Sequence, residues 1–292
     1  MLVAYLWARS VDVRQGLGIG KGVCKAKEPH PKVKIVSVDP FIAHITDFVS
    51  ESEREYLMVS GSFDFVSTAA SEGPSRELVF PLPITKKPLL APSTYADSSG
   101  TQSTSSYRTS SSAFLPPSDP CVSRLAARAA DFQGYLSPAD INIQLTAYQP
   151  GQQYKHHYDY FTPAPGAAPH TRNTLSTFFA ILHATCDDCG TEFPFVNASA
   201  RGLWDGRWCH VIDCSKSVLT TRNVPGSALF WVNLDQDGRG RKDVLHAGLP
   251  ARGGEKVGLN VWTDVDVGEV RERGVFGGSL KPPGGRGSGE GR

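Results

Sequence analysis

The sequence has almost no net charge. Its 30 lysine and arginine residues and 29 aspartate and glutamate residues leave a formal charge of +1 over 292 residues. A protein that binds nucleic acid normally shows a strong basic excess, so this composition disfavours a nucleic-acid partner. Long hydrophobic runs are also missing. No apolar run approaches the roughly 18 residues that a membrane span requires, and residues 2–8 are too few for the core of a signal peptide.

Cysteine is scarce. Six cysteines in a chain of this length exclude a small scaffold held together by disulfides. Four of them cluster, at Cys186, Cys189, Cys209 and Cys214, which leaves disulfides, a structural zinc site and free core thiols as possibilities. The loose spacing of the second pair argues against zinc. We expect Cys209 to pair with Cys214, or one of these two to pair with Cys186 or Cys189.

Composition divides the chain into one domain and several irregular segments. Residues 1–31 are basic and glycine-rich and are expected to form a poorly ordered lead-in. The domain is expected over 32–270, with an irregular insert at about 60–90, where no hydrophobic period persists. A Ser/Thr-rich run at 93–112 is typical of a solvated linker. Residues 271–292 are rich in glycine, proline and arginine and predict a disordered tail.

Hydrophobic periodicity predicts a mainly β domain with helices in front. A capping box of Ser50 and Glu53 marks the start of one helix, and apolar residues at helical spacing predict a second helix over 120–132. After Pro138 the period changes from helical spacing to two, which is typical of a strand. The expected strands cover 33–38, 141–148, 174–182, 227–234 and 256–262. Strands separated by Gly/Pro turns indicate a β-sandwich or barrel.

The residues with chemical potential concentrate in the segment 148–161, which contains His157-x-Asp159. Residues i and i+2 of a strand point to the same side, so this imidazole and carboxylate converge. With His246 they give two histidines and one carboxylate, a ligand set that leaves three metal positions open and is typical of non-haem Fe(II) oxygenases. A lone H-x-D is a weak signal, because most histidines are surface or packing residues. His156 has no acid at i+2, and we place it beside the site.

Lys256 strengthens the metal interpretation. It opens a strand in which Lys256, Gly258, Asn260 and Trp262 share a face. A buried lysine needs an anionic partner, and a dicarboxylate that chelates the metal would supply one. The alternative is a lysine at the edge of the strand whose ammonium reaches solvent.

Six blocks in order carry a resemblance to a known family. They are R-T-S at 108–110, Y-x-P-G-Q-x-Y-x-x-H-x-D at 148–159, G-T-x-F-P at 190–194, P-G-x-A-L-F-W at 225–231 with D-G at 237–238, H-A-G-x-P at 246–250, and G-x-K at 254–256 leading to Trp262. From about 33 to 263, apart from 60–90, the chain resembles the prolyl 4-hydroxylase family of 2-oxoglutarate- and Fe(II)-dependent dioxygenases. Cys209-x4-Cys214 and the D-G-R-G that begins at Asp237 resemble fungal members most.

The resemblance implies a double-stranded β-helix (jelly roll) preceded by supporting N-terminal helices. It implies that His157, Asp159 and His246 hold Fe(II), with 2-oxoglutarate and O2 as co-substrates and ascorbate as reductant. Lys256 would pair with the distal carboxylate of 2-oxoglutarate, and Tyr148 and Thr191 would also contact this co-substrate. The position of Tyr148 on the polar face of its strand agrees with that role.

The resemblance also implies a substrate and the residues that contact it. The expected reaction is 4-hydroxylation of prolyl residues in a peptide or protein, with Arg108, Ser110, Arg172 and Trp262 shaping the groove. Many members have a histidine two residues after the tryptophan, whereas this chain has Asp264. Hydroxylation of a free amino acid or a secondary-metabolite scaffold therefore stays open, as does an inactive binding module, which the intact candidate residues disfavour.

The cellular compartment stays open at this stage. The resemblance implies the secretory pathway, while the chain as given shows neither a recognisable signal nor a retention tetrapeptide. A cytoplasmic protein is the alternative.

Overall fold

The computed structural model describes residues 24, 31–60, 90–96, 102–103, 106–134, 136–163, 166, 168, 170–197 and 206–273. The expected lead-in, the 60–90 insert and the expected tail lie almost entirely outside these residues. The described strands are β1 (Lys32–Ser37), β2 (Ile42–Thr46), β3 (Ala91–Pro92), β4 (Tyr95–Ala96), β5 (Gln102–Ser103), β6 (Ser111–Phe114), β7 (Ile141–Tyr148), β8 (Tyr154–His157), β9 (Arg172–Ala184), β10 (Thr191–Asn197), β11 (Val218–Thr220), β12 (Ala228–Val232), β13 (His246–Gly248) and β14 (Lys256–Asp266). The described helices are α2 (Glu51–Ser60), α3 (Pro120–Gln133) and α4 (Val267–Arg273), with 3-10 turns at Pro138–Asp140 and Lys242–Val244.

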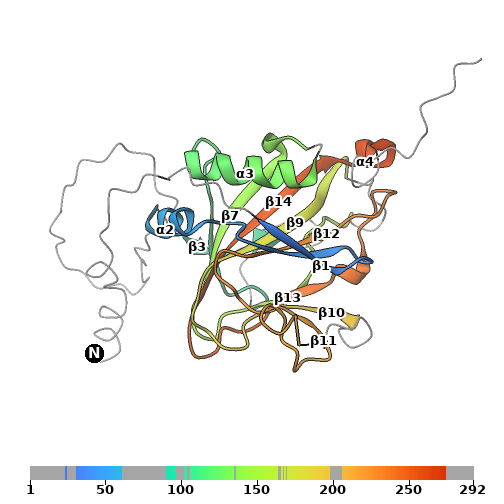
Figure 1. The fold of residues 1–292 in the computed structure, drawn as a ribbon. Helices are drawn as coiled ribbons and strands as arrows, with labels where there is room; N and C mark the ends of the chain where they lie inside the picture. The colour runs from blue at the N-terminus through green and yellow to red at the C-terminus, as the bar shows by residue number, and fades with distance from the viewer. Residues whose placement is uncertain are drawn as a thin grey trace, which may run out of the picture.

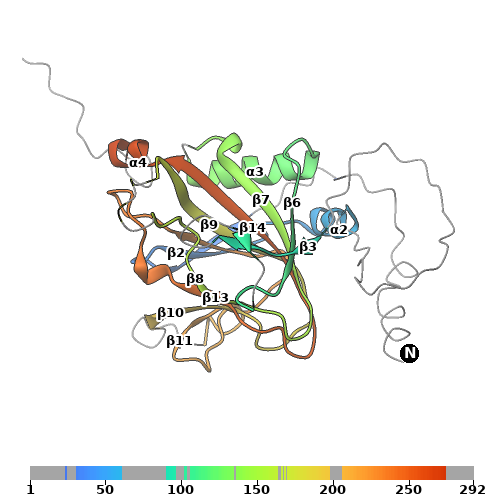
Figure 2. The same ribbon diagram turned by 180° about the vertical axis from the view of Figure 1, so that it is seen from behind.

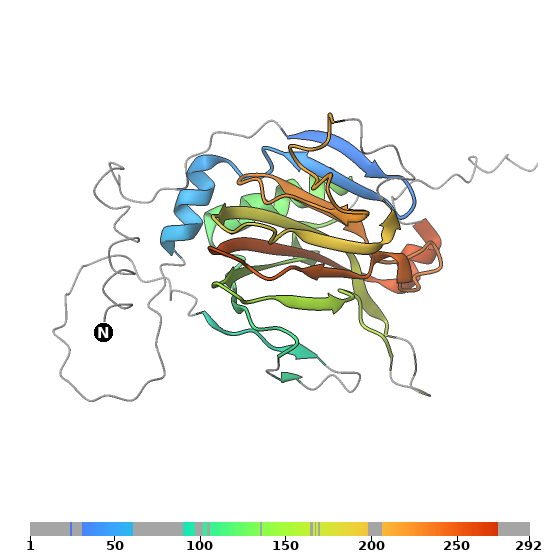
Figure 3. The same ribbon diagram turned by 90° about the horizontal axis from the view of Figure 1, so that it is seen from below.

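Two antiparallel sheets form the body of the protein. The larger has eight strands in the order β1-β2-β12-β9-β14-β7-β6-β3, and the smaller has four in the order β11-β10-β13-β8. Figure 1 shows α3 above the larger sheet and the smaller sheet below it, and Figure 3, from below, shows the strands of the larger sheet side by side. Neighbouring strands in space are mostly distant in the chain, as in a jelly roll. The predicted jelly-roll fold is confirmed.

The two faces of the larger sheet have different roles. Its outer face packs against α2 and α3, with Leu145, Phe178, Phe230 and Leu259 among the buried residues of that core. Its inner face packs against the smaller sheet through a second core that includes Phe179, Ile181 and Trp231. Because residues alternate between faces along each strand, β7, β9 and β12 contribute to both cores.

Most predicted elements are confirmed, and three expectations need correction. The Ser/Thr-rich run is not simply a solvated linker, because it contributes β6 to the edge of the larger sheet, and the buried hydroxyls of Ser93 and Ser110 lie 2.9 Å apart. Residues 271–273 belong to α4 rather than to a tail. The strand predicted at 174–182 extends to Arg172–Ala184. Polar composition misled the first of these predictions, since serine hydroxyls can satisfy one another inside a sheet edge.

None of the described helices is long and apolar enough to cross a membrane.

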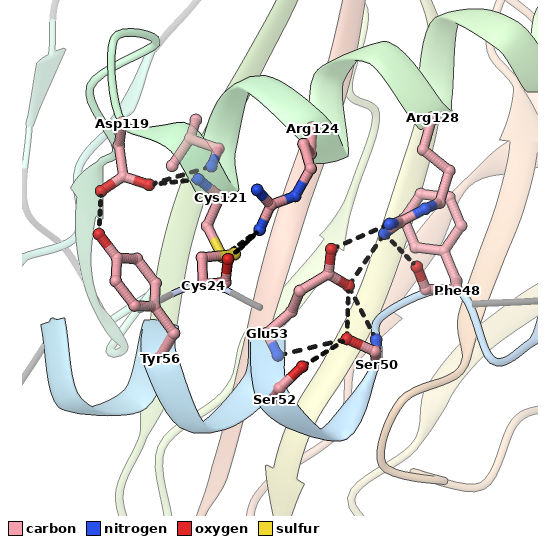
Figure 4. Close-up of a disulfide and its surroundings, with 11 residues drawn as sticks. Cys24, Phe48, Ser50, Ser52, Glu53, Tyr56, Asp119, Cys121, Arg124 and Arg128 are labelled. Atoms are coloured by element: carbon pink, nitrogen blue, oxygen red, sulfur yellow. Dashed lines mark hydrogen bonds and ion pairs between the residues drawn. A yellow bond between two sulfur atoms is a disulfide. The ribbon is translucent and has the colours of Figure 1, made fainter. Parts of the chain in front are cut away.

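The capping box predicted at the start of α2 is present and extends to α3. Ser50 N donates to Glu53 Oε2 (2.9 Å), and Glu53 N donates to Ser50 Oγ (3.3 Å). The Glu53 carboxylate also accepts two hydrogen bonds from the Arg128 guanidinium, at 2.9 and 3.1 Å. Figure 4 shows this buried pair between the two helices. The bidentate geometry fixes how α2 and α3 lie against each other over the outer face.

Asp119 caps α3 and also connects the two helices. Its Oδ1 accepts from the backbone N–H groups of Cys121 (2.8 Å) and Val122 (3.1 Å), and its Oδ2 accepts from the Tyr56 hydroxyl (2.6 Å; Figure 4). Asp119→Ala is expected to lower the free energy of unfolding by about 1–2 kcal/mol, because two N–H groups lose their acceptor. Chemical denaturation measures this. Asp131→Ala, at an exposed position of α3, should change stability by less than about 0.5 kcal/mol, and equal losses for the two variants would contradict the capping role.

All three cysteine pairs of the chain are disulfides. Cys209 pairs with Cys214 at a Cα separation of 5.4 Å, which confirms the expected pairing. Cys186 pairs with Cys189 in the loop between β9 and β10, so the zinc and free-thiol interpretations are wrong. The third disulfide joins Cys24 to Cys121 at the start of α3 across a separation of 97 residues (Figure 4). Sequence spacing gave no signal for that pair, because its proximity depends on where the helix docks.

Candidate active site

Three side chains that could hold a metal ion meet between the two sheets. His157 ends β8, Asp159 follows two residues later, and His246 begins β13. β8 and β13 are paired antiparallel, with His246 opposite His157, and Figure 2 shows them next to each other. The ligand atoms of the three residues all lie within 4.8 Å of one another. The H-x-D prediction and the choice of His246 are therefore consistent with one cluster.

Backbone carbonyls orient both imidazoles. His157 Nδ1 lies 2.7 Å from the Lys155 carbonyl oxygen, and His246 Nδ1 lies 3.0 Å from that of Val244. A carbonyl can only accept, so each Nδ1 carries the proton and each Nε2 presents a lone pair to the cluster. Burial lowers the pKa of His246 to about 4, which keeps its imidazole neutral and able to bind a metal.

Asp159 is held as a carboxylate. Its Oδ1 lies 3.5 Å from His157 Nε2 and its Oδ2 lies 3.6 Å from His246 Nε2. Thr177 on β9 donates its hydroxyl to Asp159 Oδ2 (2.8 Å), and the Asn233 amide donates in turn to Thr177 (2.9 Å). Burial alone would raise the pKa of Asp159, but His246, His157 and the Thr177 hydrogen bond together hold it well below its usual value.

Aromatic rings enclose the two imidazoles. Tyr154 stacks on His157 with ring centroids 3.4 Å apart. His246 lies against Phe193 (5.5 Å) and edge-on to Trp231 (4.7 Å). Trp231 is a buried core residue, and its contact with His246 also fixes a histidine of the cluster. Phe230 faces the outer core and does not take part.

Lys256 begins β14 and is fully buried. Its ammonium donates to the Cys189 carbonyl oxygen (2.7 Å), which also accepts from the Asn223 amide (2.9 Å). The same ammonium lies 4.7 Å from the centre of the Tyr148 ring. Burial lowers the pKa of Lys256 from 10.5 to about 7, because no carboxylate of the described residues compensates for its loss of hydration. The solvent-reaching alternative is wrong, and the ammonium is poised for an anion.

Tyr148 and Thr191 surround the same space. Tyr148 pairs with Lys256 across β7 and β14, and Thr191 pairs with Gly248 across β10 and β13. Burial raises the pKa of Tyr148, so its phenol stays protonated and can donate a hydrogen bond. The strand pairing thus brings together the three residues that the resemblance assigned to 2-oxoglutarate.

The four expected substrate contacts lie in different surroundings. Arg108 is buried: its guanidinium donates to Gln144 Oε1 (2.8 Å), Ser110 Oγ (3.3 Å) and the Thr94 carbonyl (3.2 Å), and it lies 4.7 Å from the centre of the Tyr154 ring. Arg108 and Ser110 therefore belong to one network behind the His157 ring.

Arg172 and Trp262 lie farther along the inner face. Arg172, with a side chain 56% exposed, donates to Asp140 (3.1 Å) and to the Asp264 carbonyl (2.7 Å). Trp262 pairs with Thr177, and among the described residues its buried Nε1 has no hydrogen-bond partner. The Asp264 carboxylate accepts from Thr174 (2.8 Å) and Asn142 (2.9 Å).

The family model of the 2OG-Fe(II) oxygenase superfamily matches residues 143–264. That range contains all three members of the cluster and Lys256. This part of the chain is therefore similar to the 2OG-Fe(II) oxygenases.

Curated proteins that are similar to this chain include prolyl 4-hydroxylases. Prolyl 4-hydroxylase 2 of Arabidopsis thaliana is 28% identical over 168 residues, 57% of this chain and 56% of the relative. The human prolyl 4-hydroxylase subunit alpha-3 is 29% identical over 234 residues, 78% of this chain and 34% of the relative. This chain thus spans about half or less of the length of these two proteins.

A solved structure of a prolyl hydroxylase is also similar to this chain. The viral collagen prolyl hydroxylase of Paramecium Bursaria Chlorella virus-1, in its 2OG complex, gives a TM-score of 0.48 at 20% identity. The alignment covers 77% of this chain and 96% of that one.

Four residues that position the oxygenase cluster were not singled out from the sequence. Thr177 had a signal: it is a polar residue on the inner face of β9, in line with Phe179 and Ile181. Tyr154 lay in the quoted motif, but it precedes His157 by three positions, and strand parity alone would have put the rings on opposite faces. Asn233 and the Cys189 carbonyl gave no signal, since their contacts depend on strands far apart in the chain.

Proposed function

We propose that this protein is a 2-oxoglutarate- and Fe(II)-dependent dioxygenase that hydroxylates prolyl residues of a peptide or protein at C4. The observation that carries the proposal is a two-histidine, one-carboxylate cluster between the same two sheets as a buried ammonium without a carboxylate partner among the described residues. A metal ion at the cluster and a dicarboxylate that reaches Lys256 would together satisfy both groups. Succinate and CO2 would be the co-products, and ascorbate the reductant.

The donor set fits Fe(II). His246 presents a neutral imidazole and Asp159 an ionised carboxylate. Nδ1 of His157 faces the Lys155 carbonyl, which leaves its Nε2 for the metal. Bound iron would supply activation of O2 for oxidative attack on an unactivated C–H bond. The contribution of the protein is orientation. The carbonyls of Lys155 and Val244 and the Thr177 hydroxyl fix the three ligands before any metal arrives.

The surroundings of Lys256 fit the distal carboxylate of 2-oxoglutarate. Lys256 would provide the charge, and Tyr148 and Thr191 would provide hydroxyl donors. The Cys189 carbonyl holds the ammonium in place, so its side chain loses little additional entropy when the acid binds. The buried surroundings also exclude water from the reacting centre.

The inner face beyond the cluster would bind the substrate. The buried indole N–H of Trp262 has no hydrogen-bond partner among the described residues and would donate to a substrate carbonyl, and Arg172 lies at the exposed end of β9. Arg108 and Ser110 would act close to Tyr154, where their network lies. Asp264 supports the small-molecule alternative. Its carboxylate would attract the amine of a free amino acid, whereas a histidine at this position could donate a hydrogen bond to a peptide. The inactive-module alternative is disfavoured, since every cluster residue is in place.

The proposal is tested by measuring succinate formation from 2-oxoglutarate with a panel of proline-rich peptides and with free proline. We expect peptides to stimulate succinate formation by at least about tenfold and to gain one oxygen atom on proline, as shown by mass spectrometry. Stimulation by free proline alone would favour the small-molecule alternative. If 2-oxoglutarate is neither bound nor consumed, the dioxygenase assignment is wrong.

A further inference from the structure

Gly248 lies two residues after the candidate ligand His246 on β13 and faces Tyr148 and Lys256. The two residues are separated by one position on a strand, so both point to the same side. The three atoms nearest to a Cβ built at Gly248 would be Tyr148 OH at 3.5 Å, Lys256 Nζ at 3.8 Å and Tyr148 Cε1 at 3.8 Å. The space that the missing side chain leaves is therefore directly in front of the ammonium and the phenol.

The fold itself gives no reason for a glycine at this position. Other glycines of the described residues either have a positive φ, as Gly253 does at +68°, or would bring a Cβ into a clash, as at Gly190, where Thr221 O would lie at 1.8 Å. Gly248 has neither property, because its φ is outside the positive range and all its Cβ distances are those of ordinary van der Waals contact. An alanine would fit at this position without strain.

We propose that Gly248 determines the length of the 2-oxo acid that the site accepts, by leaving room for the far carboxylate of a five-carbon diacid against Lys256 and Tyr148. This inference rests on the proposed function of the same site and adds a specificity residue to it. A methyl group at position 248 would occupy the space that this carboxylate needs, whereas a four-carbon diacid, shorter by one methylene, would stop before it. Glycine at position 248 is then required by ligand binding and not by the conformation or packing of β13.

The test is calorimetric binding of 2-oxoglutarate and of fresh oxaloacetate to the full chain, loaded with Fe(II) under anaerobic conditions so that no turnover occurs. Gly248→Ala is expected to raise the Kd for 2-oxoglutarate by at least about tenfold, as overfilling of a packed site does, and to change the Kd for oxaloacetate by less than about threefold. Thermal unfolding should leave its Tm close to that of the wild type, because the Cβ clashes with nothing. Ala247→Gly, on the opposite side of the same strand, is the control and should change neither Kd.

Three outcomes would overturn the inference. An unchanged Kd for 2-oxoglutarate in Gly248→Ala, equal weakening of both acids, or a variant that fails to fold would each contradict the role of the empty space. Failure of the proposed function gives a different result, because then the wild type binds no 2-oxoglutarate and Lys256→Ala changes nothing.

Discussion

Replacing His246 with alanine is expected to abolish 2-oxoglutarate decarboxylation and to weaken Fe(II) binding by about a hundredfold or more. Loss of an outer partner of a metal ligand already costs about 10–100-fold, and His246 is itself a ligand candidate. Its Nε2 lies 3.6 Å from Asp159, and its ring is fixed between Phe193 and Trp231, so no other described histidine can take its place without rebuilding that core. Metal titration and succinate formation measure the two losses.

His156 provides a matched control for this variant. It lies on β8 next to His157, but its imidazole points toward Glu192, 3.0 Å away, and is 45% exposed. His156→Ala should therefore retain most of the activity and the metal affinity. Undiminished turnover in His246→Ala, or equal losses in the two variants, would remove the basis for the metal assignment.

Replacing Lys256 with alanine is expected to raise the apparent KM for 2-oxoglutarate by about two to three orders of magnitude while Fe(II) binding survives. The variant removes one partner of a buried charge pair, which costs about 3–5 kcal/mol. Lys242→Ala, which removes an exposed lysine, should leave the KM unchanged. An unchanged KM in Lys256→Ala would mean that another cation binds the distal carboxylate.

The alternative cations have other partners in the structure. Arg172 is bound to Asp140 at the opposite end of β14, and Arg252 is exposed in the turn that pairs with Asp187.

Lys256 also predicts a pH dependence. Because burial lowers the pKa of Lys256 to about 7 and a bound carboxylate would raise it again, binding takes up a proton above pH 7. The Kd should then rise by about tenfold for each pH unit above 7, and this dependence should vanish in Lys256→Ala.

The sequence by itself determined the parts of this protein that depend on local pattern. Period-two alternation placed β7 and β14, the capping box placed α2, and H-x-D put His157 and Asp159 on one side of the chain. Strand parity also aimed Lys256 toward the inner face. These inferences succeed because a strand or helix presents its side chains at fixed intervals, whatever the rest of the fold does.

Tertiary structure decided everything that depends on which strands become neighbours. Only the β8–β13 and β10–β13 pairings bring His246 to His157 and Gly248 to Thr191, and only the docking of α3 brings Cys121 to Cys24. The Thr177–Asn233 support for Asp159 and the Cys189 carbonyl at the Lys256 ammonium arise in the same way. Such contacts have no period along the chain, because in a jelly roll most strand neighbours are distant in sequence and their register is fixed by packing of the two sheets.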